Sequence, residues 1–178
     1  MTKRLYEEYR HREAVFRICC TRIECVQAEI VRQRAALDAY IERHPELRTA
    51  MSPLSLDEDA PEAARRMAEA ARRTGVGPMA AVAGTMAQLG AEAGVAAGAK
   101  EAIVDNGGDV FVIGVEPVSV GLHAGTADPL NALVLRVEPE DTPLAICSSS
   151  GRMGHSFSYG RCDLVTVGQY LAPSKEHL

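Results

Sequence analysis

The fold of this chain is decided by the stretch Ala102-Ile103-Val104-Asp105-Asn106-Gly107-Gly108-Asp109-Val110-Phe111-Val112-Ile113. Two short apolar runs flank an Asn-Gly pair, and Asn-Gly between such runs is the strongest short-range signal for a β-hairpin. We therefore predict two antiparallel strands that meet at a tight turn. Everything before this stretch is mainly helical in pattern, and everything after it is strand-like.

The strand pattern continues towards the C-terminus. Further short apolar runs, split by Gly, Asn, Asp and Pro, occupy residues 118–122, 132–137, 144–147 and 163–167. Near the N-terminus, residues 9–22 alternate with period two and indicate a strand or hairpin.

Three helices are predicted between these strand regions. The first covers 26–43 and ends at His44, because proline disfavours the α conformation in the residue before it. The second opens at Asp59-Ala60-Pro61 and ends near Arg73, and the third opens at Gly77-Pro78. In the third, Gly90, Gly94 and Gly98 recur every four residues, so this helix should lie close to a sheet.

The predicted architecture is a single α+β domain over residues 1–178, with an antiparallel sheet covered on one face by helices. The chain has 178 residues and a net charge of -5, and this acidic balance argues against nucleic-acid and anionic-membrane binding. The charged N-terminus lacks the apolar segment of a signal peptide, so a cytoplasmic location is expected. Five cysteines without a CxxC pair are expected to be structural thiols rather than metal ligands.

The hairpin turn is the first candidate binding segment. One interpretation is purely structural, a tight turn between strands. The other adds function, because a Gly-Gly turn exposes backbone amides while Asp105 and Asp109 offer carboxylates to a ribose hydroxyl or a cation. The two interpretations are compatible.

The second candidate is the segment from Ile146 to Asp163, which contains Ser148, Ser149, Ser150, Gly151, Arg152 and His155. Backbone amides, hydroxyls and one guanidinium suit a phosphate group. A flexible surface loop is the alternative. The segment lacks the P-loop pattern, and a serine hydrolase is disfavoured because no Gly-x-Ser-x-Gly elbow is present. The arginine pairs 65–66 and 72–73 are interpreted as the solvated face of the second helix.

Three ordered motifs, at 75–84, 104–109 and 147–156, resemble a family of ApbE-like proteins, distantly related to the FAD:protein FMN transferase ApbE. The resemblance implies a T-fold-like architecture and a pocket for FAD, FMN or another phosphate-bearing nucleotide. It assigns cofactor binding to Asn106, Gly107, Gly108, Asp109, Ser149, Ser150 and Gly151, and a catalytic role to His155.

The resemblance is incomplete at its end. ApbE holds magnesium partly with an Asp and a Thr on a helix after its last Val-Thr-Val strand; here Val165-Thr166-Val167 is present, but the Asp/Thr pair is not. We therefore expect no metal ligand in this chain, and any magnesium-dependent FMN-transferase-like activity is in question. The alternative function is a non-catalytic domain that binds a partner or forms a homo-oligomer.

Overall fold

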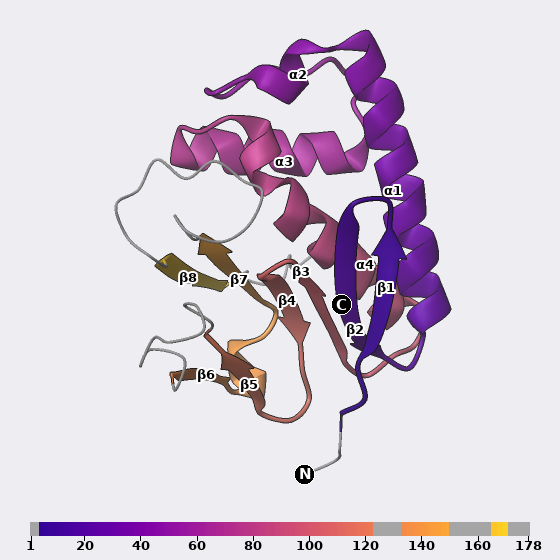
Figure 1. The fold of residues 1–178 in the computed structure, drawn as a ribbon, viewed down its shortest axis with the longest axis vertical. Helices are drawn as coiled ribbons and strands as arrows, with labels where there is room; N and C mark the ends of the chain where they lie inside the picture. Colours follow the sequence, from indigo (N-terminus) through magenta and orange to yellow (C-terminus); the bar gives the residue numbers. More distant parts are fainter. Residues whose placement is uncertain (1–3, 123–132, 150–164, 171–178) are drawn as a thin grey trace.

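The computed structural model describes residues 4–122, 133–149 and 165–170 (Figure 1). The helices are α1 (Ile23–Arg43), α2 (Glu46–Thr49), α3 (Glu62–Thr74) and α4 (Val82–Ala96), with 3-10 turns at Pro78–Ala81 and Pro139–Asp141. The strands are β1 (Glu7–His11), β2 (Ala14–Cys20), β3 (Ala102–Asn106), β4 (Asp109–Ile113), β5 (Val118–Gly121), β6 (Val134–Val137), β7 (Leu144–Ser149) and β8 (Val165–Tyr170). No helix in the described part of the chain is both long and apolar enough to cross a membrane.

Six strands form one sheet in the order β1-β2-β3-β4-β7-β8, and every neighbouring pair is antiparallel. The predicted hairpin is confirmed: Asn106 pairs with Asp109, and Gly107 and Gly108 between them have φ of 65° and 102°. Positive φ at both central residues is the conformation for which glycine is suited. The N-terminal hairpin is also confirmed as β1 and β2.

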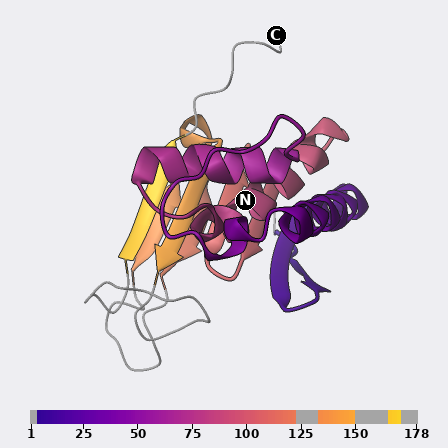
Figure 2. The same cartoon turned by 90° about the horizontal axis from the view of Figure 1, so that it is seen from above.

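Helices α1, α3 and α4 cover one face of this sheet (Figure 2). The main core lies between them, where Ile30 and Leu37 of α1 and Met86 of α4 pack with Val104 and Phe111 of the sheet. The predicted α+β class and the antiparallel sheet with helices on one face are therefore confirmed. Helices α1 and α3 match the first two predicted helices within a few residues. The short helix α2 was not predicted.

The other face of the sheet carries a feature that the sequence did not predict. Strands β5 and β6 form a separate two-stranded ribbon rather than joining the main sheet. Val118 and Val137 of the ribbon bury a second, smaller core with Ile103, Val112 and Ile146 of the sheet. The ribbon thus shields those three apolar side chains, which point away from the helices.

The glycines of α4 need a partial correction. Gly98 lies beyond the end of the helix with φ +96°, so it is not part of the predicted glycine stripe. A Cβ on Gly90 would lie 3.2 Å from Ile30 Cγ1 of α1, and one on Gly94 would lie 2.7 Å from Cys20 Sγ of β2. The two glycines therefore let α4 approach α1 as well as the sheet.

Candidate functional site

A groove of about 880 Å³ lies between α3 and the helix-facing side of β4, β7 and β8. Figure 2 shows α3 crossing above this end of the sheet. The volume is within the usual range of small-molecule sites, which is roughly 300–1,000 Å³. This is the candidate functional site, and we call it the α3 groove.

Small side chains explain why the groove is open. Its lining includes Ala70 of α3, Ala80 and Ala81 of the 3-10 turn, Gly84 of α4 and Ala145 of β7. A Cβ on Gly84 would lie 3.6 Å from Cys147 Sγ, which is ordinary van der Waals contact and not a clash. Space therefore remains where larger side chains would have filled the gap between helix and sheet.

The floor has a polar and an apolar part. On the apolar side, Val165 and Val167 of β8 line the groove and are 46% and 58% exposed. On the polar side are Asp109 of β4 and Cys147 of β7, and Cys147 pairs directly with Val167 in the sheet register. A ligand in the groove would meet a carboxyl group and a thiol at one side and valine side chains at the other.

Asp109 and Cys147 each shift the pKa of the other. Burial, and then the neighbouring Asp105, raise the pKa of Asp109, while hydrogen bonds from the Cys147 thiol and the amides of Ser148 and Gly84 oppose the rise. Burial and the negative charge of Asp109 raise the pKa of Cys147 to about 12. At neutral pH the sulfur is thus a neutral thiol, which is a poor nucleophile, and it serves as a hydrogen-bond donor.

Asp109 also has a structural role. Gly84 lies in the first turn of α4, and the N-cap residue of that helix, Ala81, provides no side-chain cap. The backbone amide of Gly84 opposes the rise in the pKa of Asp109, so this helix end favours the ionised carboxylate. The strand residue and the first turn of α4 therefore interact at the edge of the groove.

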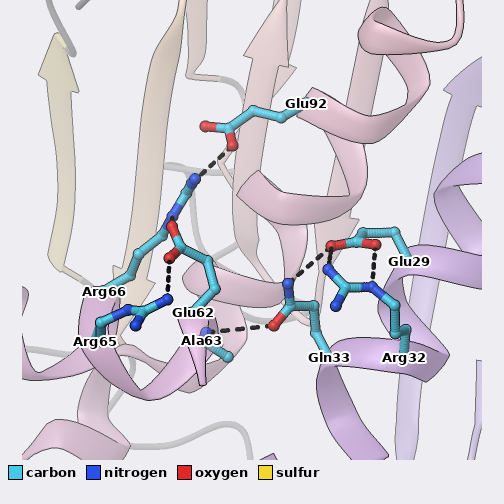
Figure 3. Close-up of polar contacts among 8 residues, drawn as sticks. All are labelled: Glu29, Arg32, Gln33, Glu62, Ala63, Arg65, Arg66 and Glu92. Atoms are coloured by element: carbon cyan, nitrogen blue, oxygen red, sulfur yellow. Dashed lines mark hydrogen bonds and ion pairs between the residues drawn. The ribbon is translucent and has the colours of Figure 1, made fainter. Parts of the chain in front are cut away.

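The α3 wall is rich in charge. Glu62, Arg65, Arg66, Glu69, Arg72 and Arg73 all line the groove, while the opposite face of α3, with Ala64, Met67 and Ala71, is buried in the core. Arg66 lies 2.8 Å from Glu62 and extends to Glu92 of α4 at 2.7 Å (Figure 3). The amide of Ala63 donates to Gln33 Oε1 of α1 at 3.3 Å, which fixes the start of α3 on α1 (Figure 3).

The structure brings part of the two predicted segments together. From the hairpin turn, Gly107 and Asp109 line the α3 groove, and from the second segment Cys147 and Ser148 line it as well. Ser149 ends β7. Ser150, Gly151 and His155 lie outside the described residues. The roles assigned to the whole set stay predictions.

Asn106 and Gly108 of the turn already form hydrogen bonds within the protein. The side-chain amide of Asn106 donates to Ala83 O at 3.1 Å, and the Gly108 amide donates to Asp105 Oδ1 at 2.9 Å. These contacts tie the turn to α4 and stabilise its shape. Of the turn's predicted binding residues, Gly107 and Asp109 are the ones that line the groove.

Sequence reasoning missed the arginine-rich wall, because the two arginine pairs were interpreted as solvated. Arg65, Arg72 and Arg73 are indeed more than half exposed, yet they also border the groove. The spacing of 62, 66, 69 and 73 places these side chains on one helix stripe next to the buried alanine face. That spacing was the available signal.

The groove does not fit a magnesium ion well. Magnesium requires several oxygen ligands in octahedral geometry. Among the described lining residues, Asp109 is the carboxyl group on the floor, whereas Glu62 and Glu69 are bound by arginines. A cluster of His44, Asp57 and Asp59 lies outside the groove lining, and Asp59 is paired there with Arg43.

Comparison with known proteins places the chain in a family. The family model described as AbpE bacteria matches residues 15–174. A UPF0280 protein of Methanocella arvoryzae is 46% identical over 138 residues, which cover 78% of this chain and 56% of the relative. A UPF0280 protein of Methanosarcina acetivorans is 41% identical over 164 residues, which cover 90% of this chain and 64% of the relative. The chain therefore spans less than two thirds of the length of these relatives, and it belongs to the ApbE-like family that the model AbpE bacteria describes.

Proposed function

We propose that this chain binds a phosphate-bearing nucleotide in the α3 groove, with FMN or FAD as the first candidates. The observation that carries the proposal is the convergence of Gly107 and Asp109 with Cys147 and Ser148 on one groove whose opposite wall bears arginines. Apolar surface for a ring, a few fixed polar groups and cationic side chains are what such a ligand requires.

The resemblance of three sequence motifs to ApbE-like proteins suggests the same class of ligand. The distant relation to the FAD:protein FMN transferase ApbE is part of this proposal and suggests a flavin. FMN transfer would be a more specific function than flavin binding. The described groove residues favour binding over transfer, because their oxygen ligands do not suit magnesium. Any activity or substrate of the whole protein is likewise a proposal.

A groove-filling substitution tests the proposal. Gly84→Leu places a large side chain in the groove, whereas Ala96→Leu places the same side chain at the exposed end of the same helix. FMN, FAD and ATP are titrated by calorimetry and fluorescence, with and without magnesium. We expect saturable binding of at least one, weakened at least about tenfold by Gly84→Leu and unchanged by Ala96→Leu. No binding of any of the three by the unmodified chain would refute the proposal.

One observation favours a second function, self-association. Strand β8 is the last strand of the sheet order, and its Val165 and Val167 are exposed. An edge strand with apolar side chains is a surface on which another chain can pair. Light scattering across a hundredfold range of concentration distinguishes the functions, since a monomer throughout that still binds nucleotide excludes the second.

A further inference from the structure

The charges along α3 are balanced at one end and not at the other. At the N-terminal end, Arg65 and Arg66 share Glu62, and Arg66 also contacts Glu92 of α4 at 2.7 Å. Two guanidinium groups there face two carboxylates. Figure 3 shows this balanced cluster, in which Arg66 bridges the two helices. The side chains at this end therefore carry no excess positive charge, and the helix N-terminus adds about half a unit.

At the C-terminal end, Arg72 and Arg73 both pair with Glu69, and no other ion pair of these three is seen among the described residues. The two arginine side chains are 64% and 63% exposed, so they can turn towards a ligand without disturbing the packing of the core. Two guanidinium groups share one carboxylate, and each guanidinium has five N–H donors in a fork that matches phosphate. This triad therefore holds excess positive charge and spare donors.

The helix dipole reduces this excess but does not cancel it. Arg72 and Arg73 lie in the last turn of α3, where the backbone contributes about half a negative charge. One positive charge minus about half leaves a net attraction for an anion. The site is solvated, so the expected gain is moderate and sensitive to salt.

Groups of unlike chemistry thus line the groove. The Glu69–Arg72–Arg73 triad borders the groove on α3, and Asp109 borders it on β4, with Ala145, Val165 and Val167 also in the lining. Given the proposed nucleotide function, on which this inference rests, we propose that Arg72 and Arg73 hold the phosphate of the ligand. Its planar heterocycle then lies on the valines of β8, with an N–H group of the ring directed to Asp109.

The inference places the phosphate at the C-terminal end of α3 and not on the segment that follows β7. It also specifies the class of ligand: a phosphate ester of an apolar-faced ring that carries a hydrogen-bond donor. A purely anionic ligand, such as inorganic phosphate, makes the triad contacts alone and binds weakly.

Matched ligand pairs test this placement. FMN is compared with riboflavin, and AMP with adenosine, since each pair differs only in the phosphate. The titrations use the unmodified chain and the double variant Arg72→Gln/Arg73→Gln. Arg32→Gln, which removes an equally exposed arginine that pairs with Glu29 on α1, is the control.

We expect the unmodified chain to bind the phosphorylated member of a pair about 10- to 100-fold more tightly. The double variant should reduce this preference to less than about threefold while affinity for the unphosphorylated member stays the same, and the Arg32→Gln control should keep the preference. A phosphate preference that survives in the double variant would overturn the inference and leave the proposed function intact. Equal binding of the phosphorylated and unphosphorylated members by the unmodified chain would also overturn the inference and leave the proposed function intact. If none of the four ligands binds, the proposed function fails and the inference fails with it.

Discussion

The two ends of α4 use the same residue type for opposite purposes. Near its C-terminal end, Gly94 allows close packing, because a Cβ there would lie only 2.7 Å from Cys20 Sγ and 2.9 Å from Val26 Cγ2. Near its N-terminal end, Gly84 leaves open space, because a Cβ there would meet nothing closer than 3.6 Å. One end fixes the helix on α1 and β2, and the other leaves the α3 groove unfilled.

This difference teaches how the molecule combines a rigid frame with a binding groove. The half built from α1, α4, β2 and β3 is tightly packed, so it can hold the groove residues in fixed positions. The half built from α3, β7 and β8 leaves apolar side chains exposed at the groove. Substitutions of the same kind should therefore have different effects in the two halves.

Truncation of an aliphatic side chain gives the largest expected contrast. Ile30 of α1 is fully buried, and Ile30→Ala should lower the free energy of unfolding by about 2–5 kcal/mol. Val167 of β8 is 58% exposed, and Val167→Ala should change it by less than about 0.5 kcal/mol. Urea denaturation measures both values. Similar losses in the two variants would contradict the division into a packed and an open half.

Addition of a methyl group to the two glycines gives the next contrast. Gly94→Ala should destabilise the fold by about 1–3 kcal/mol, because the new Cβ would lie 2.7 Å from Cys20 Sγ and 2.9 Å from Val26 Cγ2, so that both side chains must shift. Gly84→Ala should stabilise it by about 0.5–1 kcal/mol, since alanine favours the helix and nothing is displaced. Thermal unfolding of the two variants checks the opposite signs, and equal signs would refute the comparison.

Gln33 connects the two halves, and its loss should cost less. Its side chain is buried, accepts from the Ala63 amide at the start of α3 and donates to Glu29 Oε1 at 2.8 Å. Gln33→Leu keeps the volume but leaves a buried amide unpaired, so we expect a loss of about 1–2 kcal/mol in chemical denaturation. Gln27→Leu on the same helix, at a partly exposed position, is the control and should change stability by less than about 0.5 kcal/mol.

The smallest expected effect is a change in pH dependence at Asp109. Burial raises the pKa of this carboxyl, so the folded state holds its proton more tightly than the unfolded chain does. The resulting stabilisation is present at acidic pH, below the ordinary pKa of aspartate, and is lost as the pH rises through the raised value.

Asp109→Asn removes the ionisable group, and with it this loss of stability, while the side chain keeps nearly the same size. The stability of the variant relative to the unmodified chain should increase from pH 3 to pH 7, measured by urea unfolding at each pH. The same substitution should lower the pKa of Cys147, because a negative charge leaves its neighbour, and thiol alkylation should then become faster. A pH profile identical to that of the unmodified chain would contradict the burial of Asp109.

The secondary structure was predictable from the sequence wherever local signals were strong. The Asn-Gly turn identified β3 and β4, and proline and glycine marked the ends of α1 and α3. The ribbon of β5 and β6 was missed because period and turn residues do not say which strands pair. The lining of the groove was predicted only in part: Asp109, a predicted binding residue, lines it, whereas the position of Arg72 and Arg73 on its wall depends on α3 crossing the sheet near β8, which no local pattern encodes.

The alanine-rich face of α3 has a dynamic consequence. Four of the five residues that this helix buries are alanines, namely Ala63, Ala64, Ala68 and Ala71, and the fifth is Met67. Alanine buries little apolar area, so α3 gains less from docking than a helix of leucines would. Its last turn should therefore open locally more often than α1 or α4, and its amide protons should exchange with deuterium sooner. Local opening of this helix end would widen the α3 groove while the sheet and the packed half keep their structure.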